Sequence, residues 1–150
     1  MHAEWTNDRF TVSTDRARLD IGVIHSFLSE RAYWALGRSR EAVARTIEHS
    51  LCFGLFDEAA QVGFARVVTD YAIFAYLCDV FVIESHRGCG LSKWLLRCVL
   101  SHPAMTGIRR FHLLTNDAHT LYQQLGFTAL ASPERHMELV ALSPAPDPKR

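Results

Sequence analysis

Apolar residues in the first third of the chain recur with the periods of one strand and two helices. The segment RFTVST (9–14) predicts a strand, because apolar and polar residues alternate along it. Residues 19–28 carry apolar side chains near helical spacing and predict the first helix. Ser39 precedes REAVARTIEHS, whose apolar residues share one face, so we expect Ser39 to cap a second helix that ends near Ser50.

The middle of the chain predicts three strands. The strand-like runs LCFGLFD (51–57) and QVGFARVVTD (61–70) flank the short turn EAA, which is typical of a hairpin. The segment AYLCDVFVI (75–83) is almost continuously apolar and is bounded by charged residues. This pattern is typical of a strand buried on both faces, so we expect 75–83 to be the central strand of the sheet.

The region after the central strand predicts a helix and a fifth strand. LSKWLLRCVLSH (91–102) has apolar residues at positions i, i+3, i+4, i+7 and i+8. Pro103 follows directly and is expected to stop this helix. RRFHLLT (109–115) predicts the fifth strand.

The C-terminal part predicts a fourth helix and one more strand. Asn116 or Asp117 is placed to cap the helix, and Gly126 supplies a left-handed end. The weak alternation of HMELVAL (136–142) predicts a final strand. Residues 143–150 contain too much proline to continue it and are expected to form a loose tail.

Length and composition indicate one globular domain over residues 1–150, with its core over about 9–142. Sixteen basic residues balance sixteen acidic ones, so nothing in the overall charge favours nucleic acid or an anionic membrane as partner. The sequence has no apolar run of 18 residues and no signal-peptide pattern, which favours the cytoplasm. Histidine and cysteine do not cluster at metal-ligand spacing, so we expect no metal and reduced thiols.

The glycine-rich turn RGCG (87–90) links the central strand to the helix at 91–102. A helix that begins at such a turn can bind an anion, because its first amides lack partners and the peptide dipoles add positive charge. Arg87 and the hydroxyl of Ser92 are candidate side-chain donors to a diphosphate. The alternative is that the glycines only form a sharp turn. Neither the P-loop pattern nor the dinucleotide pattern G-x-G-x-x-G is present.

Two segments resemble the signatures of the GNAT superfamily of N-acetyltransferases. DVFVIESHRGCGLSKWLL resembles its acetyl-CoA motif, with Arg87, Gly90 and Ser92 at the three defining positions. NDAHTLYQQLGF resembles its second signature, about 30 residues further on. The matching positions of the second signature are Asn116, Ala118, Leu121, Tyr122, Gly126 and Phe127. Ser92 stands where the family has glycine or alanine, and Cys89 where a basic residue is frequent, but the main-chain amides remain.

The resemblance implies an α/β fold with a mixed, mostly antiparallel central sheet of about six to seven strands and four flanking helices. The strands at 75–83 and 109–115 would splay apart, and the pantetheine arm of acetyl-CoA would pair with the exposed edge of 75–83. The residues that the resemblance places at the coenzyme are Phe81, Val82, Ile83, Arg87, Gly88, Cys89, Gly90, Leu91, Ser92, Asn116 and Tyr122.

The chemistry implied is direct acetyl transfer from acetyl-CoA to a primary amine through a tetrahedral intermediate. Tyr122 is the candidate general acid, because a phenol with a pKa of about 10 stays protonated at neutral pH and can protonate the leaving thiolate. Asp79 is the candidate that receives the substrate ammonium or, through water, its proton. His119, His86 and water are the other candidate bases. Tyr122 as a core residue and Asp79 as a hydrogen-bonded strand residue are the structural alternatives.

The acceptor pocket is expected near the first-helix connection and the loop before the central strand. Its candidate residues are Tyr33, Trp34, Asp70, Tyr71 and Asp79. Aromatic rings and carboxylates suit a cationic amine, although such rings can also simply pack. A small-molecule amine is the predicted acceptor. A protein or peptide amine and a non-catalytic acyl-CoA-binding module are the alternatives, and a homodimer is left open.

Overall fold

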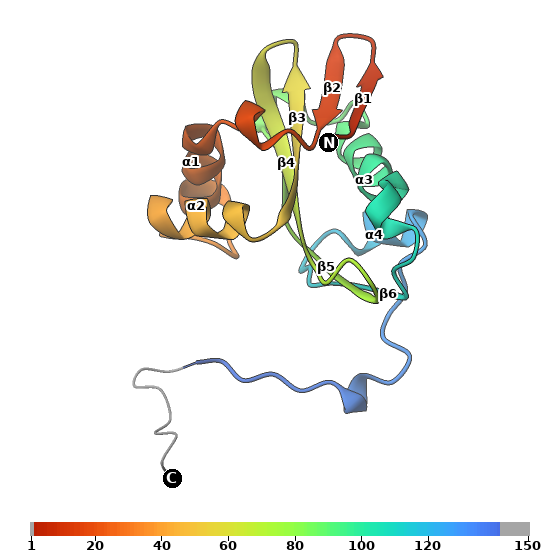
Figure 1. The fold of residues 1–150 in the computed structure, drawn as a ribbon. Coiled ribbons are helices and arrows are strands. Elements are labelled where there is room, and N and C mark those ends of the chain that lie inside the picture. The colour runs from red at the N-terminus through yellow and green to blue at the C-terminus, as the bar shows by residue number, and fades with distance from the viewer. Residues whose placement is uncertain (1, 142–150) are drawn as a thin grey trace. The chain divides into compact units, whose positions relative to one another are not determined.

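The computed structural model describes residues 2–141, and the chain divides into two compact units, residues 1–117 and 118–150. The first unit holds a six-stranded sheet with three helices, and the second holds the fourth helix (Figure 1). Among the described residues, no helix combines the length and the apolar character needed to cross a membrane.

The sheet is mixed and mostly antiparallel, as expected. Its strands follow one another in chain order. Each of the first four strands pairs antiparallel with the next, whereas β5 and β6 are parallel. The strands are β1 (Glu4–Asn7), β2 (Phe10–Ser13), β3 (Leu51–Asp57), β4 (Ala60–Thr69), β5 (Phe74–Val82) and β6 (Arg110–Leu113). The strand expected at 9–14 is β2. Its hairpin partner β1 was not predicted, because EWTN has a single large apolar residue and no apolar alternation.

Four α-helices form in the described residues: α1 (Ile21–Arg31), α2 (Arg40–Glu48), α3 (Leu91–Ser101) and α4 (His119–Gln124). The hydroxyl of Ser39 accepts a hydrogen bond from the amide of Ala42, which confirms the predicted cap of α2. The predicted cap of α4 by Asn116 or Asp117 is wrong. Ala118 occupies that position, and the two polar residues come too early to reach the amides of the first turn.

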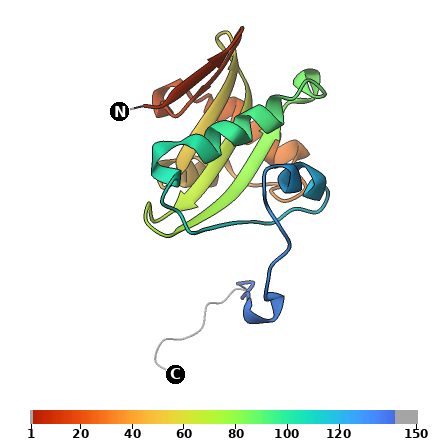
Figure 2. The same cartoon turned by 90° about the vertical axis from the view of Figure 1, so that its right-hand side faces the viewer.

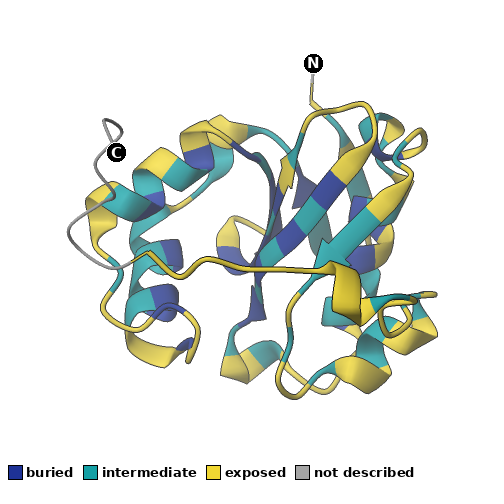
Figure 3. Ribbon diagram, turned by 90° about the horizontal axis from the view of Figure 1, so that it is seen from below, coloured by how far each residue is buried: buried dark blue, intermediate teal, exposed yellow. Residues whose placement is uncertain are grey.

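Helices cover both faces of the sheet within the first unit. On one face, α1 and α2 pack with β4 and β5 in a buried cluster, where the rings of Phe27 and Phe81 stack with centroids 4.1 Å apart. On the other face, α3 crosses β3, β4 and β5 (Figure 2) and buries Leu95, Leu96 and Val99. Figure 3 shows buried residues both along the strands and on parts of the helices. Coverage on both faces explains why the central strands are almost continuously apolar.

The strand β5 bulges and then loses its neighbour on one side. Cys78 pairs with Arg66 and Phe81 pairs with Phe64, so two residues of β5 lie opposite one residue of β4. Asp79 lies in this bulge with a φ of +53°. The strand β6 pairs with β5 only as far as Leu77. Within the described residues, the β6 side of β5 is therefore open from Cys78 onward, which is the expected splay.

The second unit contains α4 and a short extended segment. Gly126 has a φ of +100°, as predicted, and the ring of Phe127 packs against that of Tyr122 with centroids 5.7 Å apart. The strand expected at 136–142 does not form in the described residues 136–141. Met137 is 97% exposed and Leu139 87% exposed. A segment with alternating residues becomes a strand only when a neighbouring strand pairs with its backbone groups. The weak alternation does not indicate whether such a neighbour is present. Residue 142 and the tail at 143–150 lie outside the described residues.

Gly63 is a position in the sheet with no room for a side chain. A Cβ there would lie 2.9 Å from the Cδ2 of Leu55 and 2.9 Å from the carbonyl oxygen of Phe81. We therefore expect Gly63→Ala to lower the free energy of unfolding by about 1–3 kcal/mol, measured by urea denaturation. Gly107→Ala, whose Cβ would meet no atom within 4 Å, is the control and should change it by less than about 0.5 kcal/mol. Equal losses in the two variants would contradict this account.

Candidate active site

The turn between β5 and α3 leaves the start of a long helix without a capping side chain. Gly88 and Gly90 both have a φ of +81°, and Gly90 is the N-cap residue of α3. A Cβ at either glycine would meet open space, so the left-handed backbone rather than crowding requires glycine here. Because Gly90 has no side chain, the first amides of α3 are available to an anion, with the helix dipole behind them.

The side chains of the turn are arranged less simply than the sequence predicts. Ser92 lies half-buried on the first turn of α3. The Nε of Arg87 donates to the carbonyl oxygen of Val82 at 2.9 Å, and its guanidinium lies 5.9 Å from the ring centroid of Phe27. Arg87 is thus directed back along β5. Cys89 is exposed, and its Sγ lies 3.1 Å from the carbonyl oxygen of His86.

His86, one of the candidate bases, is tied to the hairpin end of β3. Its Nε2 lies 2.8 Å from the carboxylate of Asp57, and its Nδ1 lies 2.8 Å from the hydroxyl of Ser85. Hydrogen bonds from His86 and Arg9 lower the pKa of the Asp57 carboxyl. Both ring nitrogens of His86 are engaged, which supports a role in holding the turn against the sheet.

The open edge of β5 presents the peptide group of Val82. The amide of Ile83 donates to the carbonyl oxygen of Val62 at 2.9 Å, toward β4. Because successive residues of an antiparallel strand direct their peptide groups to alternate edges, those of Val82 face the open side. Three residues are predicted for the pantetheine contact. Phe81 and Ile83 direct their peptide groups toward β4, whereas Val82 directs its peptide group toward the open edge.

The carboxylate of Asp79 is buried and fully engaged. One oxygen accepts from the indole Nε1 of Trp34 at 2.9 Å, and the other accepts from Arg38 and from the Nε of Arg66, each at 2.8 Å. The side chain of Asp79 is only 2% exposed, and Arg66 also donates to the hydroxyl of Ser50 at 3.0 Å. Two guanidinium groups around one carboxylate leave a net positive charge. This geometry supports a positioning role for Asp79 rather than a free carboxylate for an ammonium group.

The thiols on the strands beside Arg66 do not ionise near neutral pH. Burial raises the pKa of Cys52 to about 12 and that of Cys78 to about 11. The attraction of Arg66 opposes this rise but does not cancel it. Neither thiol is therefore an activated nucleophile, which suits transfer without a covalent enzyme intermediate.

Tyr33 and Trp34 lie together in the connection between α1 and α2. They are 47% and 42% exposed, and their rings form an edge-to-face pair with centroids 5.0 Å apart. The phenol oxygen of Tyr33 accepts a hydrogen bond from the amide of Asn116 at 3.0 Å. Trp34 thus contacts Asp79, and its neighbour Tyr33 contacts the segment after β6.

Asp70 and Tyr71 lie elsewhere, in the turn between β4 and β5. The carboxylate of Asp70 accepts hydrogen bonds from the amides of residues 72–74, which lower its pKa. Thr69, just before this turn, is three residues from Arg66 along β4, or roughly 10 Å. No contact in the described residues brings Asp70 or Tyr71 to Asp79, and Asp70 shapes its own turn.

Arg38 and Arg66 are the residues of this cluster that the sequence analysis missed. Arg66 carries the one charged side chain within the buried part of β4, in QVGFARVV. A cation in one buried strand and an acid in its neighbour signal a buried ion pair, and this signal could have identified Arg66. Arg38 follows a glycine in an irregular segment, where no local pattern marks it.

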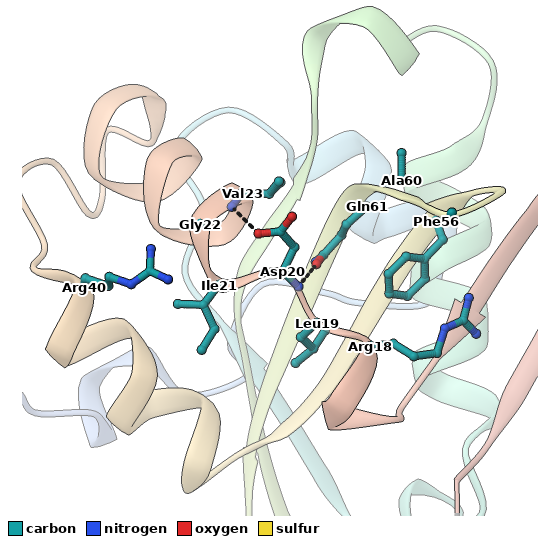
Figure 4. Close-up of a pocket in the computed structure, with 11 residues that line it drawn as sticks. Arg18, Leu19, Asp20, Ile21, Gly22, Val23, Arg40, Phe56, Ala60 and Gln61 are labelled. Carbon is teal, nitrogen blue, oxygen red and sulfur yellow. Dashed lines mark hydrogen bonds between the residues drawn. The ribbon is translucent and has the colours of Figure 1, made fainter.

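A separate pocket of about 600 Å³ lies at the start of α1 (Figure 4). Asp20 caps the helix there by accepting from the amide of Val23 at 3.1 Å, and its own amide donates to Gln61 at 2.7 Å. None of the residues predicted for coenzyme or acceptor lines this pocket. In the part of the chain that the structure describes, no three histidine, cysteine or acidic side chains are placed to hold a metal ion.

Comparison with known proteins gives consistent matches. The model of the acetyltransferase (GNAT) domain family matches residues 48–129. A protein from Gibberella zeae that carries the provisional name of an acetyltransferase is 32% identical, over 79% of this chain and 78% of that protein. A crystal structure from Xanthomonas campestris pv. campestris, provisionally assigned to the GNAT family, is 52% identical with a TM-score of 0.86, over 88% of this chain and 93% of that one.

A more distant structure shows the same fold. N-acetylglutamate synthase from Neisseria gonorrhoeae, solved with coenzyme A and N-acetyl-glutamate, is 19% identical with a TM-score of 0.70. The similarity covers 86% of this chain and 30% of that chain. At this identity the likeness extends to the fold alone.

Removing the charge of Asp79 should destabilise the protein. We expect Asp79→Asn to lower the free energy of unfolding by about 3 kcal/mol in urea denaturation, because two guanidinium groups would lose their shared anion. Asn keeps the shape and tolerates the left-handed backbone. Asp8→Asn is the control, because Asp8 is exposed and has a similar φ of +57°. A loss in Asp8→Asn as large as that in Asp79→Asn would show that the ion pairs are not the cause.

Proposed function

Because the chain belongs to the GNAT family of acetyltransferases, we propose that it transfers the acetyl group of acetyl-CoA directly to a primary amine of a small molecule. One observation carries the proposal: α3, whose start is uncapped, is the next α-helix after the strand whose edge is open. An anion-binding helix end and a free strand edge are what a diphosphate with an amide-containing arm requires.

The main chain does most of the coenzyme binding in this proposal. The amides of residues 88–92 would hold the diphosphate, with the hydroxyl of Ser92 as an added donor. The outward amide N–H of Val82 would pair with the pantetheine arm, while the carbonyl oxygen of the same residue stays bonded to Arg87. Acetyl-CoA itself supplies the activated acetyl group and a thiolate leaving group.

Tyr122 is the proposed general acid. It stands at the tyrosine position of the second signature, and the family match runs through it to residue 129. On α4 its ring packs against Phe127, and its amide donates to the carbonyl of Ala118 at 3.2 Å, so the local fold fixes the ring. The phenol would give its proton to the departing thiolate.

The proton of the amine requires a different acceptor. Asp79 is occupied by Trp34 and two arginines, and His86 has a partner at both ring nitrogens. These contacts favour water as the immediate acceptor. Asp79 then contributes by fixing the position of the α1–α2 connection relative to β5.

Measurement of free thiol while the protein turns over acetyl-CoA tests the proposed function directly. We expect release in the presence of small primary amines. Release only with peptide amines would instead indicate a protein or peptide acceptor. Acetyl-CoA binding with no release from any acceptor would indicate a binding module and contradict the enzymatic proposal.

Replacing Tyr122 by Phe should lower kcat by roughly 100-fold, because general acid catalysis is lost, while the Kd for acetyl-CoA stays within about twofold. Steady-state thiol release and titration calorimetry measure the two quantities. Tyr71→Phe, at a turn residue that is 58% exposed, is the matched control and should retain wild-type kcat. An unchanged kcat in Tyr122→Phe would remove Tyr122 from the mechanism.

Gly90→Val should raise the Kd for acetyl-CoA at least about 10-fold, because a side chain would obstruct the approach of the diphosphate to the helix amides. Gly37→Val is the control, since Gly37 has a φ of +77° and also faces open space. Both variants carry a similar backbone cost, which thermal unfolding monitors. Equal affinities in the two variants would argue against binding at the start of α3.

A further inference from the structure

The cluster around Asp79 carries more positive than negative charge. Arg38 and Arg66 both bond to the single carboxylate of Asp79. The carboxylates that would suit a cationic acceptor are already engaged, Asp79 by these arginines and Asp70 by the amides of its own turn. An acceptor with only positive charge would therefore meet a like charge, whereas an anionic group would be attracted.

We propose that the acceptor is a primary amine that also carries a carboxylate, as an amino acid does, and that the guanidinium of Arg38 binds this carboxylate. The inference rests on the proposed function and specifies its substrate class. It assigns Arg38 to acceptor binding, and it assigns Asp79 to holding Arg38 in place.

The position of the cluster in the fold supports this assignment. The ladder between β5 and β6 ends at the pair Leu77 and Leu113, and Asp79 lies two residues further along β5. The edge that the pantetheine arm would use begins at this point. Arg38, held 2.8 Å from the carboxylate of Asp79, therefore lies near the level of β5 at which the open edge begins.

The α1–α2 connection adds an aromatic wall next to the guanidinium. Trp34 donates to the same carboxylate that holds Arg38, and Tyr33 packs on Trp34. Tyr33 also accepts from the amide of Asn116, three residues after β6 ends. Trp34 and Arg38 therefore share one anchor at Asp79, which holds the two rings and the guanidinium in a single cluster.

Arg38 is better suited to bind a ligand than Arg66. The side chain of Arg66 is 12% exposed, and it donates both to Asp79 and to Ser50. The side chain of Arg38 is 24% exposed and reaches Asp79 through one terminal nitrogen. A guanidinium has five N–H donors in a planar fork that matches a carboxylate in two-point contact. Arg38 can therefore hold Asp79 and a second carboxylate at once.

Matched acceptors test the proposal. Thiol release from acetyl-CoA is measured with each standard amino acid, its carboxamide and its decarboxylated amine, for example phenylalanine, phenylalaninamide and phenethylamine, and with phosphoethanolamine. We expect kcat/KM for the best amino acid to exceed that of its carboxamide at least about 10-fold. Preference for the carboxamide, the plain amine or phosphoethanolamine would overturn the proposal.

Arg38 variants identify the residue responsible. In Arg38→Gln the preference for acid over carboxamide should fall to about twofold or less, with the loss mainly in KM for the acid. Trp34→Phe removes a different donor to Asp79 and should keep the acid-to-carboxamide ratio, although rates can change. The Kd for acetyl-CoA and the thermal unfolding of both variants report whether the fold is intact. A ratio that survives Arg38→Gln would exclude Arg38 as the carboxylate site.

A binding measurement separates this proposal from the proposed function. N-acetyl amino acids and their amides are titrated calorimetrically into the protein saturated with coenzyme A. Binding of an acid that is lost in Arg38→Gln, with no thiol release from any amine, would refute acetyl transfer and leave the carboxylate site standing. Thiol release from amines that lack a carboxylate, with no preferential binding of any acid, would support acetyl transfer and refute the carboxylate site. Absence of both would overturn both.

Discussion

The carboxylate of Asp79 accepts hydrogen bonds from three side chains that come from two separate parts of the chain. Trp34 and Arg38 arrive from the connection between α1 and α2, and Arg66 arrives from the neighbouring strand β4. Asp79 itself lies in a left-handed bulge, at the point where β5 leaves β6. A backbone conformation that is costly outside glycine persists because three charged or polar partners hold it. The open strand edge and the placement of the aromatic rings both depend on this cluster.

The proposed coenzyme side of the site uses main-chain groups, whereas the proposed acceptor side uses side chains. The start of α3 offers main-chain amides, which any residue supplies, so serine and cysteine within the motif leave the anion site in place. The acceptor side offers specific side chains, Tyr33, Trp34 and Arg38, on an irregular connection. A scaffold that binds a common coenzyme through its backbone can vary its acceptor through a few loop residues.

Charge on this protein matters locally rather than globally. The formal net charge is zero, with sixteen basic and sixteen acidic residues, and gives no overall field for steering. The excess of guanidinium over carboxylate around Asp79 arises from three residues that are far apart in sequence. Composition cannot reveal such a cluster, because the electrostatic interaction between its charges depends on burial and on short distances.

The sequence by itself determined the elements whose signals are local: the buried strands, the cap of α2 by Ser39, the length of α3, and the left-handed glycines at its start. Apolar period, capping chemistry and backbone freedom act within a few residues, so they can be recognised along the chain. Only the tertiary structure decided the pairing of β1, the absence of a strand at 136–141, the direction of Arg87 back along β5, and the occupation of Asp79. These depend on partners 41 and 45 residues distant, as for Arg38 and Trp34, or on whether a neighbouring strand is present. Contacts of that kind are set by packing, which no local pattern encodes.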